Sequence, residues 1–280
     1  MTCNMKGKIR RIACLVGLLL ILAGLCVGGY PIVSNWYCEY QAGKEIRNYQ
    51  EALKDQDEEE IATEWEQAQT YNQMLNSGQG VSKASYNDML AVTDAIGYLE
   101  IPKLNLYLPI YHGIEESVLE KGVGHMEGTS LPVGGSSTHC VLSGHTGLPT
   151  AKLFTHLDEL EEGDQFYIHV LEETLAYQVD QTKIVLPEET DDIQIVPGKD
   201  YVTLLTCIPY GVNSHRLLVR GERITYEPEQ IAVEASTEEN PEAAVSENTV
   251  YNKEEILLLA GAVLLLILAM IAIVHKKRKK

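Results

Sequence analysis

Two long apolar runs without charged residues, one near each end of the chain, constrain its architecture more than any other feature. They cover residues 12–29 and 256–274. About twenty apolar residues in a helix span the hydrocarbon core of a bilayer. Each run is therefore predicted to be a transmembrane helix, which places the folded region between two membrane anchors.

Basic residues flank both runs on their outer sides and predict the orientation of the chain. Four lie within residues 1–11, and the sequence HKKRKK ends the chain over residues 275–280. Because basic flanks stay in the cytoplasm, both tails are predicted to be cytoplasmic. We expect a two-pass protein of the cell membrane that contacts membrane lipid and holds residues 30–255 outside.

Each apolar run has an alternative interpretation. The first could be a cleaved signal peptide with small residues near Gly28, although it exceeds the usual core of about 7–15 apolar residues. The second could belong to a signal for attachment to the cell wall, which also ends in an apolar stretch and a basic tail. No LPXTG-like pentapeptide precedes it, which favours a permanent anchor.

The region between the anchors is strongly acidic. The chain has 40 acidic and 22 basic residues, and nine of the basic residues belong to the two tails. Such a surface repels the phosphates of nucleic acids, so nucleic acid is excluded as a partner. The acidic run at residues 57–60 lacks the spaced oxygen ligands of a calcium loop and is interpreted as a solvated helix face.

Residues 40–75 are polar, with apolar residues at helical spacing, and predict one or two helices. Residues 76–85 (NSGQGVSKAS) predict a turn or a flexible loop. From residue 96 onward, short apolar and β-branched runs separated by Gly and Pro predict the strands of a β-sandwich or barrel. These runs are IGYLEIP, LYLPIYH, THCVLSGH, QFYIHV, LAYQVD, KIVL, YVTLLTC and HRLLVRGERITY.

The segment TLLTCIPYGVNSHRLLVRG at residues 203–221 holds the first candidate site residues. Two apolar runs enclose a Pro-Tyr-Gly turn, which predicts a hairpin. Because side chains alternate between the faces of a strand, Cys207 and Arg216 can meet across this hairpin. In HCVLSGHTGLP, which begins at His139, the same alternation places His145 on the face of His139.

The folded exterior contains Cys140 and Cys207, and a disulfide between them is one interpretation. The other is two free thiols, which is favoured if His145 faces Cys207, because Cys140 then points away. His139 and Cys140 also suggest a metal pair with His145. Neighbouring residues on a strand face opposite ways, however, so no metal site is predicted.

These residue types suit acyl transfer through a covalent intermediate. A thiol of ordinary pKa, about 8.5, is mostly protonated at neutral pH, so a nucleophilic cysteine needs a base or a cation nearby. The imidazole of His145 can stabilise a thiolate and then protonate the leaving amine. The guanidinium of Arg216 can stabilise the oxyanion of the tetrahedral intermediate. No cofactor is expected.

TLLTC followed nine residues later by an Arg resembles the active-site signature of sortases, and of class C in particular. The resemblance extends upstream through GYLEIPKLNLYLPIYHG, VGHMEGTSLPVGG and LSGHTGLPTAKLFTHLDEL. It implies that Cys207 is the nucleophile, His145 the general acid/base and Arg216 the stabiliser of the oxyanion or substrate. It further implies cleavage after Thr in an LPXTG-like signal of a pilin or surface protein, and transfer of the acyl group to an amine, most often a pilin Lys, in pilus assembly.

Together these features predict a mainly β fold: a sortase-type closed β-barrel with short helices, preceded by an N-terminal helical segment and flanked by two transmembrane helices. The expected order is a cytoplasmic basic tail (1–11), a transmembrane helix (12–29), an extracellular helical segment and lid region (30–95), the catalytic barrel (96–226), an acidic flexible linker (227–255), a transmembrane helix (256–274) and a cytoplasmic basic tail (275–280).

The sequence departs from the class C pattern in two places. Residues 76–88 lack the Asp-Pro-aromatic triplet of the usual lid, which predicts a weaker or absent lid, and Ile208 follows the nucleophile where Thr is commoner. Two other functions stay open. One is anchoring of surface proteins to a peptidoglycan precursor. The other is a noncatalytic exported module, either a degenerate pilus-assembly partner or a disulfide-stabilised adhesin-like domain.

Overall fold

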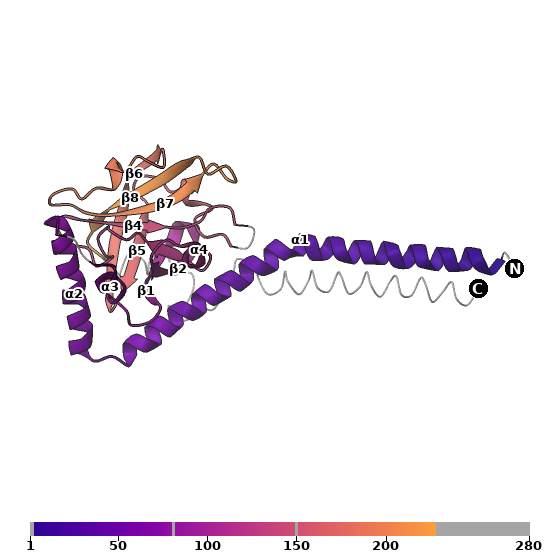
Figure 1. The fold of residues 1–280 in the computed structure, drawn as a ribbon, viewed down its shortest axis with the longest axis horizontal. Helices are drawn as coiled ribbons and strands as arrows, with labels where there is room; N and C mark the ends of the chain where they lie inside the picture. The colour runs from indigo at the N-terminus through magenta and orange to yellow at the C-terminus, as the bar shows by residue number, and fades with distance from the viewer. Residues whose placement is uncertain (1–2, 80–81, 149–150, 228–280) are drawn as a thin grey trace. The chain divides into compact units, whose positions relative to one another are not determined.

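The structure is a computed structural model that describes residues 3–79, 82–148 and 151–227. The described residues contain eight strands, which form a closed barrel in the order β1-β2-β3-β4-β7-β8-β6-β5 (Figure 1). The strands are β1 (Ala95–Ile101), β2 (Leu106–His112), β3 (Val123–His125), β4 (Thr138–Ser143), β5 (Gln165–Val170), β6 (Glu173–Val185), β7 (Asp200–Ile208) and β8 (His215–Ile224). The predicted mainly β, closed-barrel fold is confirmed.

The barrel interior explains why these segments form strands. Successive side chains of a strand point to opposite faces, and the inward-facing apolar residues pack into one core, which includes Leu99, Ile110, Phe166, Val202 and Val219. Antiparallel pairing of β1 with β5 closes the barrel. Closure leaves no free sheet edge, which removes the backbone groups that would otherwise need a partner.

Two details of the strands differ from the prediction. The runs LAYQVD and KIVL are not two strands but parts of β6, which pairs with β8 along both halves and has a register shift between Val179 and Gln181. The polar residue at this bulge, Asp180, faces Arg220 of β8 at 2.7 Å, so it interrupts the apolar pattern without ending the strand. The three-residue strand β3 was not predicted either, because it is too short to show a pattern.

The helices precede or connect the strands. They are α1 (Cys3–Lys54), α2 (Glu58–Asn76), α3 (Lys83–Asn87) and α4 (Glu116–Leu119), with 3-10 turns at Pro102–Leu104, Leu157–Glu159 and Asp191–Ile193. Helix α1 is continuous through Pro31, and its portion Val16–Lys54 is the one helix of the described residues that is long and apolar enough to cross a membrane. The run at 256–274 and residues 228–255 of the linker before it lie beyond the described residues, so the second anchor stays a prediction.

The N-terminal helices share the core of the barrel instead of acting only as a spacer. Tyr49 of α1 is buried, and its hydroxyl accepts a hydrogen bond from the Leu171 amide at 2.7 Å and donates one to the Ile96 carbonyl at 3.4 Å. Helix α2 contributes Ala68 and Tyr71 to the same apolar cluster. Helices α1 and α2 and the barrel therefore bury their apolar side chains against one another.

The start of α2 and the position of α3 explain two sequence features. The acidic run at 57–60 forms a capping box, in which the Glu60 amide donates to the Asp57 carboxylate at 2.8 Å, and this satisfies an otherwise unpaired helix terminus. The predicted loop at 76–85 is partly wrong, because Ser82 caps α3 through the Ser85 amide at 3.2 Å.

Asn72 of α2 joins that helix to the barrel. Its buried side chain accepts a hydrogen bond from the Leu131 amide at 2.7 Å and donates one to the Leu131 carbonyl at 3.1 Å. The side-chain amide thus pairs with the backbone of a chain segment 59 residues away. These two directional hydrogen bonds hold α2 against the barrel in addition to its apolar packing.

We expect Asn72→Ala to lower the free energy of unfolding by about 2–4 kcal/mol, because it leaves a buried donor and a buried acceptor unpaired. Urea denaturation of the full-length protein in detergent, followed by tryptophan fluorescence, measures the change. Gln73→Ala on the exposed face of the same helix is the control. Equal stability of the two variants would show that the Leu131 contacts do not hold α2.

Candidate active site

Strands β7 and β8 bring two of the three predicted site residues together. They pair antiparallel, and Cys207 lies directly opposite Arg216. The predicted hairpin and its pairing are therefore confirmed. The guanidinium of Arg216 donates from Nη1 to the carbonyls of Asn213 and His215, each at 3.0 Å. These contacts hold one end of the guanidinium against the hairpin loop.

His145 follows β4, which pairs parallel to β7 up to Ser143 opposite Leu205. The alignment continues one step further, since the Gly144 amide donates to the Leu205 carbonyl at 3.0 Å and the Thr206 hydroxyl donates to the Gly144 carbonyl at 2.7 Å. The same register carried one residue further places His145 at the level of Cys207.

The faces of β4 and β7 show which side chains can meet. On one face, His139 Nε2 lies 2.7 Å from the Thr203 hydroxyl. The other face holds Cys140, which packs with Val202 and Leu204 in the barrel core. By alternation, His145 and Cys207 belong to the face of His139 and Thr203.

The two cysteines of the barrel therefore lie on opposite faces, and both are free. Cys140 is buried, and this burial raises the pKa of its thiol well above the ordinary value. Cys207, at the end of β7, is partly exposed. The alternative of a Cys140–Cys207 disulfide is thus not formed in this structure.

The ring of His139 is buried and held by contacts within the protein. Its Nδ1 lies 2.9 Å from the Gln194 carbonyl, its Nε2 bonds to Thr203, and burial lowers the pKa of the ring. Both ring nitrogens are engaged within the protein, which leaves neither for the suggested metal pair with Cys140. Across the described ranges, no group of three His, Cys, Asp or Glu side chains could hold a metal ion.

An acidic residue that sequence reasoning missed lies beside His145. The carboxylate of Glu116, the first residue of α4, is 3.4 Å from His145 Nε2. That nitrogen is buried, and it has no hydrogen-bond partner among the described residues. The two residues are far apart in sequence and on elements without a common period, so no pattern could have joined them.

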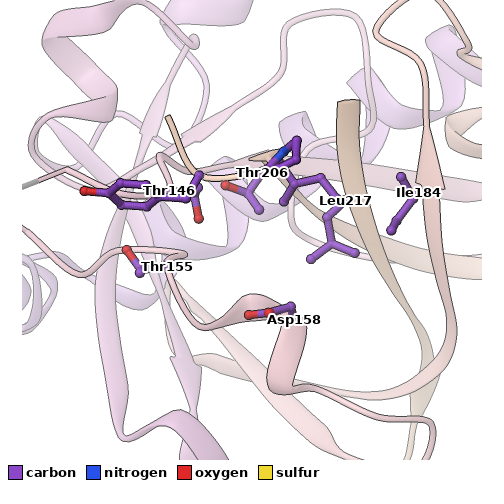
Figure 2. A pocket seen from close by; sticks show the side chains of 9 residues that line it. Thr146, Thr155, Asp158, Ile184, Thr206 and Leu217 are labelled. Carbon is purple, nitrogen blue, oxygen red and sulfur yellow. The ribbon is translucent and has the colours of Figure 1, made fainter. Parts of the chain in front are cut away.

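A cavity of about 360 Å³ adjoins the end of β7 and β8 (Figure 2). Its walls include the neighbours of the candidate residues: Thr206 and Ile208 on either side of Cys207, Leu217 after Arg216, and Thr146 after His145. Since neighbours on a strand face opposite ways, the lining residues Thr206, Ile208 and Leu217 lie on the face opposite to the side chains of Cys207 and Arg216. The sequence alone had indicated no cavity residue.

The loop after His145 touches the β7–β8 loop over this cavity. A Cβ placed on Gly147 would lie 2.3 Å from ring carbons of Tyr210, and the backbone φ of Gly147 is +75°. Only glycine meets both conditions without strain. Gly147 thus allows the segment that carries His145 to pack closely on the hairpin that carries Cys207 and Arg216.

Comparison with known proteins shows what this arrangement resembles. A family model described as the Sortase domain matches residues 99–224. Sortase D of Bacillus subtilis is 35% identical over 153 residues, which cover 54% of this chain and 73% of that protein. Sortase A of Bacillus anthracis is 28% identical over 222 residues, which cover 77% of this chain and 96% of that protein.

Solved structures of sortases C are also similar. Sortase C of Streptococcus pneumoniae, described in connection with catalysis and pilin substrate specificity, is 46% identical with a TM-score of 0.62 and covers 65% of this chain and 97% of its own. Sortase C1 of Streptococcus agalactiae is 46% identical with a TM-score of 0.64 and covers 66% of this chain and 100% of its own.

The placement of the two barrel thiols predicts different reactivities. Iodoacetamide added to the folded full-length protein should label Cys207 and leave Cys140 unmodified, because Cys140 is buried and its thiol resists ionisation. Peptide mapping by mass spectrometry locates the label, and denatured protein should react at both positions. A Cys140–Cys207 cross-linked peptide in a non-reducing digest would contradict the arrangement of the two faces.

Proposed function

Because the chain belongs to the sortase family of cysteine transpeptidases, we propose that it cleaves an LPXTG-like sorting signal after Thr and transfers the acyl group to a Lys amine of a pilin subunit. The observation that carries this proposal is the strand pairing that sets Cys207 opposite Arg216 and aligns His145 with them. The partners would be a pilin with the sorting signal and an acceptor amine.

In the proposed reaction, Cys207 is the nucleophile. Its thiolate attacks the carbonyl carbon of the Thr residue, and the negative charge that develops on the carbonyl oxygen is stabilised by Arg216. His145 in its imidazolium form gives a proton to the leaving amine as the peptide C–N bond breaks. The product is a thioester between the substrate and Cys207.

The second half of the proposed reaction resolves this thioester. The acceptor amine attacks the carbonyl carbon, the C–S bond to Cys207 breaks, and a new amide bond forms. An acceptor that arrives as an ammonium loses two protons in total. Neutral His145 takes one and becomes imidazolium again, and the other goes to solvent, so the enzyme returns to its starting state.

The degree of similarity favours pilin substrates over wall anchoring. The solved sortases C are 46–49% identical to this chain, whereas the curated sortases A are 25–29% identical. Anchoring of surface proteins to a peptidoglycan precursor is the second candidate, since it uses the same first half-reaction. The two candidates differ only in the amine that resolves the thioester.

The proposed location is the outer face of the cell membrane. Helix α1 is long and apolar enough to serve as the first anchor, and the barrel would lie outside, where sorting signals are displayed. The second anchor at 256–274 is proposed from the sequence. The Asp-Pro-aromatic lid is proposed to be weaker or absent, because residues 76–88 lack this triplet.

Intact mass spectrometry of the full-length protein with an LPXTG-type peptide should show an adduct equal to the acylating fragment. Cys207→Ala should form none, and the matched variant Cys140→Ala should form it as the wild type does. A Lys-containing pilin acceptor should then remove the adduct faster than a peptidoglycan stem-peptide amine. No adduct on a protein whose Cys207 is alkylated readily would refute the proposed substrate, and faster resolution by the stem peptide would favour wall anchoring.

Replacement of Arg216 should slow acylation strongly. We expect Arg216→Ala to lower the rate of acyl-enzyme formation about 10²–10³-fold, the range found when one oxyanion donor is removed. Arg220, on the same strand and face, is paired with Asp180 at 2.7 Å, and Arg220→Ala should change the rate much less. A rate for Arg216→Ala within threefold of the wild type would remove Arg216 from the mechanism.

A further inference from the structure

We propose that Glu116 is a positioning residue for His145: its carboxylate holds the Nε2 side of the imidazole and so orients the ring. The proposal rests on the function proposed above for His145. The Glu116 carboxylate lies 3.4 Å from His145 Nε2. This nitrogen is buried and has no hydrogen-bond partner among the described residues, so the carboxylate is the acceptor toward which it can turn.

The 3.4 Å separation is longer than a formed hydrogen bond, which joins such atoms at about 2.7–2.9 Å when both partners are charged. Catalytic hydrogen bonds are often long in the unliganded state and shorten when substrate binds. The Glu116 side chain is 73% exposed and the His145 side chain 22% exposed. The carboxylate therefore has room to move toward the ring, while the ring is confined.

The backbone that leads to Glu116 is held by Tyr86 of α3, whose hydroxyl is itself fixed by a buried histidine. The Gly113 amide donates to the Tyr86 hydroxyl at 3.1 Å. That hydroxyl lies 2.8 Å from Nδ1 of His125, a buried residue whose Nε2 lies 2.8 Å from the Ser130 carbonyl. Burial lowers the pKa of His125 to about 4, so its ring is neutral near pH 7, with Nε2 as donor and Nδ1 as acceptor.

A close backbone approach completes this support. A Cβ placed on Gly124 would lie 2.2 Å from the Gly113 carbonyl oxygen, so β3 passes directly beside the chain that leads into α4. Any larger residue at position 124 would push this chain away. The entry to α4 is thus held by Tyr86 of α3 and by the close approach of β3, which limits where Glu116 can reach.

Contact at Nε2 assigns the two ring nitrogens to different tasks. An imidazolium donates from both nitrogens. If Nε2 donates to Glu116, Nδ1 is the nitrogen that protonates the leaving amine and later accepts a proton from the acceptor amine. The carboxylate also stabilises the imidazolium that accompanies the Cys207 thiolate. The arrangement corresponds to the acidic partner that orients the base in other nucleophile–base pairs.

The expected effect is modest, because Glu116 is mostly exposed to solvent. Exposed ion pairs contribute roughly 0.2–1 kcal/mol, which corresponds to about a 1.4–5-fold change in rate. We therefore expect Glu116→Gln to lower the rate constant of acyl-enzyme formation about 2–5-fold, with the half-saturating peptide concentration unchanged. The matched variant Glu120→Gln removes the same charge at the other end of α4 and should leave both values unchanged.

A double-mutant cycle tests whether Glu116 acts through His145. The rate of Cys207 alkylation by iodoacetamide in the full-length protein is the readout, because it needs no substrate and stays measurable without His145. Glu116→Gln should slow alkylation about 2–5-fold in the wild-type background and have no effect in the His145→Ala background. A purely structural role would not produce this dependence on His145.

The outcomes separate this inference from the proposed function. An unchanged alkylation rate in Glu116→Gln, or an equal decrease in both backgrounds, overturns the role of Glu116. Absence of any acyl-enzyme in the wild type, or an unaltered rate of its formation in His145→Ala, refutes the proposed function itself. If Glu116→Asp, which keeps the charge, recovers part of the rate that Glu116→Gln loses, the carboxylate charge and not the side-chain length is responsible.

Discussion

The pairing of β7 with two different neighbours is the constraint on which the candidate site depends. β7 runs parallel to β4 and antiparallel to β8, and its last residues therefore lie beside the ends of both. The parallel neighbour supplies His145 from the segment that leaves β4, and the antiparallel neighbour supplies Arg216 from the beginning of β8. Because β7 has a neighbour on each side, it brings together three side chains from segments far apart in sequence.

The closed barrel fixes the register in which β7 pairs with its two neighbours. Each strand of the barrel has two partners, so a shift of β7 by one residue would exchange its buried and exposed faces. Leu204 would then leave the core and Cys207 would enter it. The free energy of burying the apolar face thus also fixes which side chains face outward. The N-terminal helices add to the same core through Tyr49 and Tyr71, so they contribute to the stability of the barrel that holds the site.

The spacing of apolar residues and the alternation of side chains along strands made part of this arrangement predictable from the sequence. The pairing of Cys207 with Arg216 followed from one hairpin whose two runs and turn are adjacent in sequence, and the opposite orientation of Cys140 followed from counting along β4. The resemblance to sortases supplied the link from His145 to this hairpin, which alternation alone allowed but did not require. By contrast, the contact of Glu116 with His145 depends on how β2, α4 and β3 turn in space, and no local pattern records that path.

The same limit explains the errors in the strands and loops. β6 carries a bulge at Asp180, and a bulge shows in sequence as a break, although the hydrogen-bonded ladder to β8 resumes after it. β3 is three residues long, and it forms a strand because it pairs with β2 and β4. Tyr86 fell in the predicted lid region without an assigned strand or helix, yet its hydroxyl links α3 to His125 of β3 and accepts from the Gly113 amide at the entry to α4.

Cys140 and Cys207 show how the barrel assigns chemistry to identical side chains. Cys140 faces the apolar interior, where a thiolate would lose its hydration without a charged partner, and burial raises the pKa of its thiol accordingly. Cys207 is partly exposed, pairs in register with Arg216 and, when the β4–β7 register is continued, lies level with His145. The difference between an inert packing residue and a candidate nucleophile is therefore one of strand parity. A single-residue insertion in β7 before Cys207 would be enough to turn this thiol toward the barrel interior, whereas Cys140 on β4 would stay where it is.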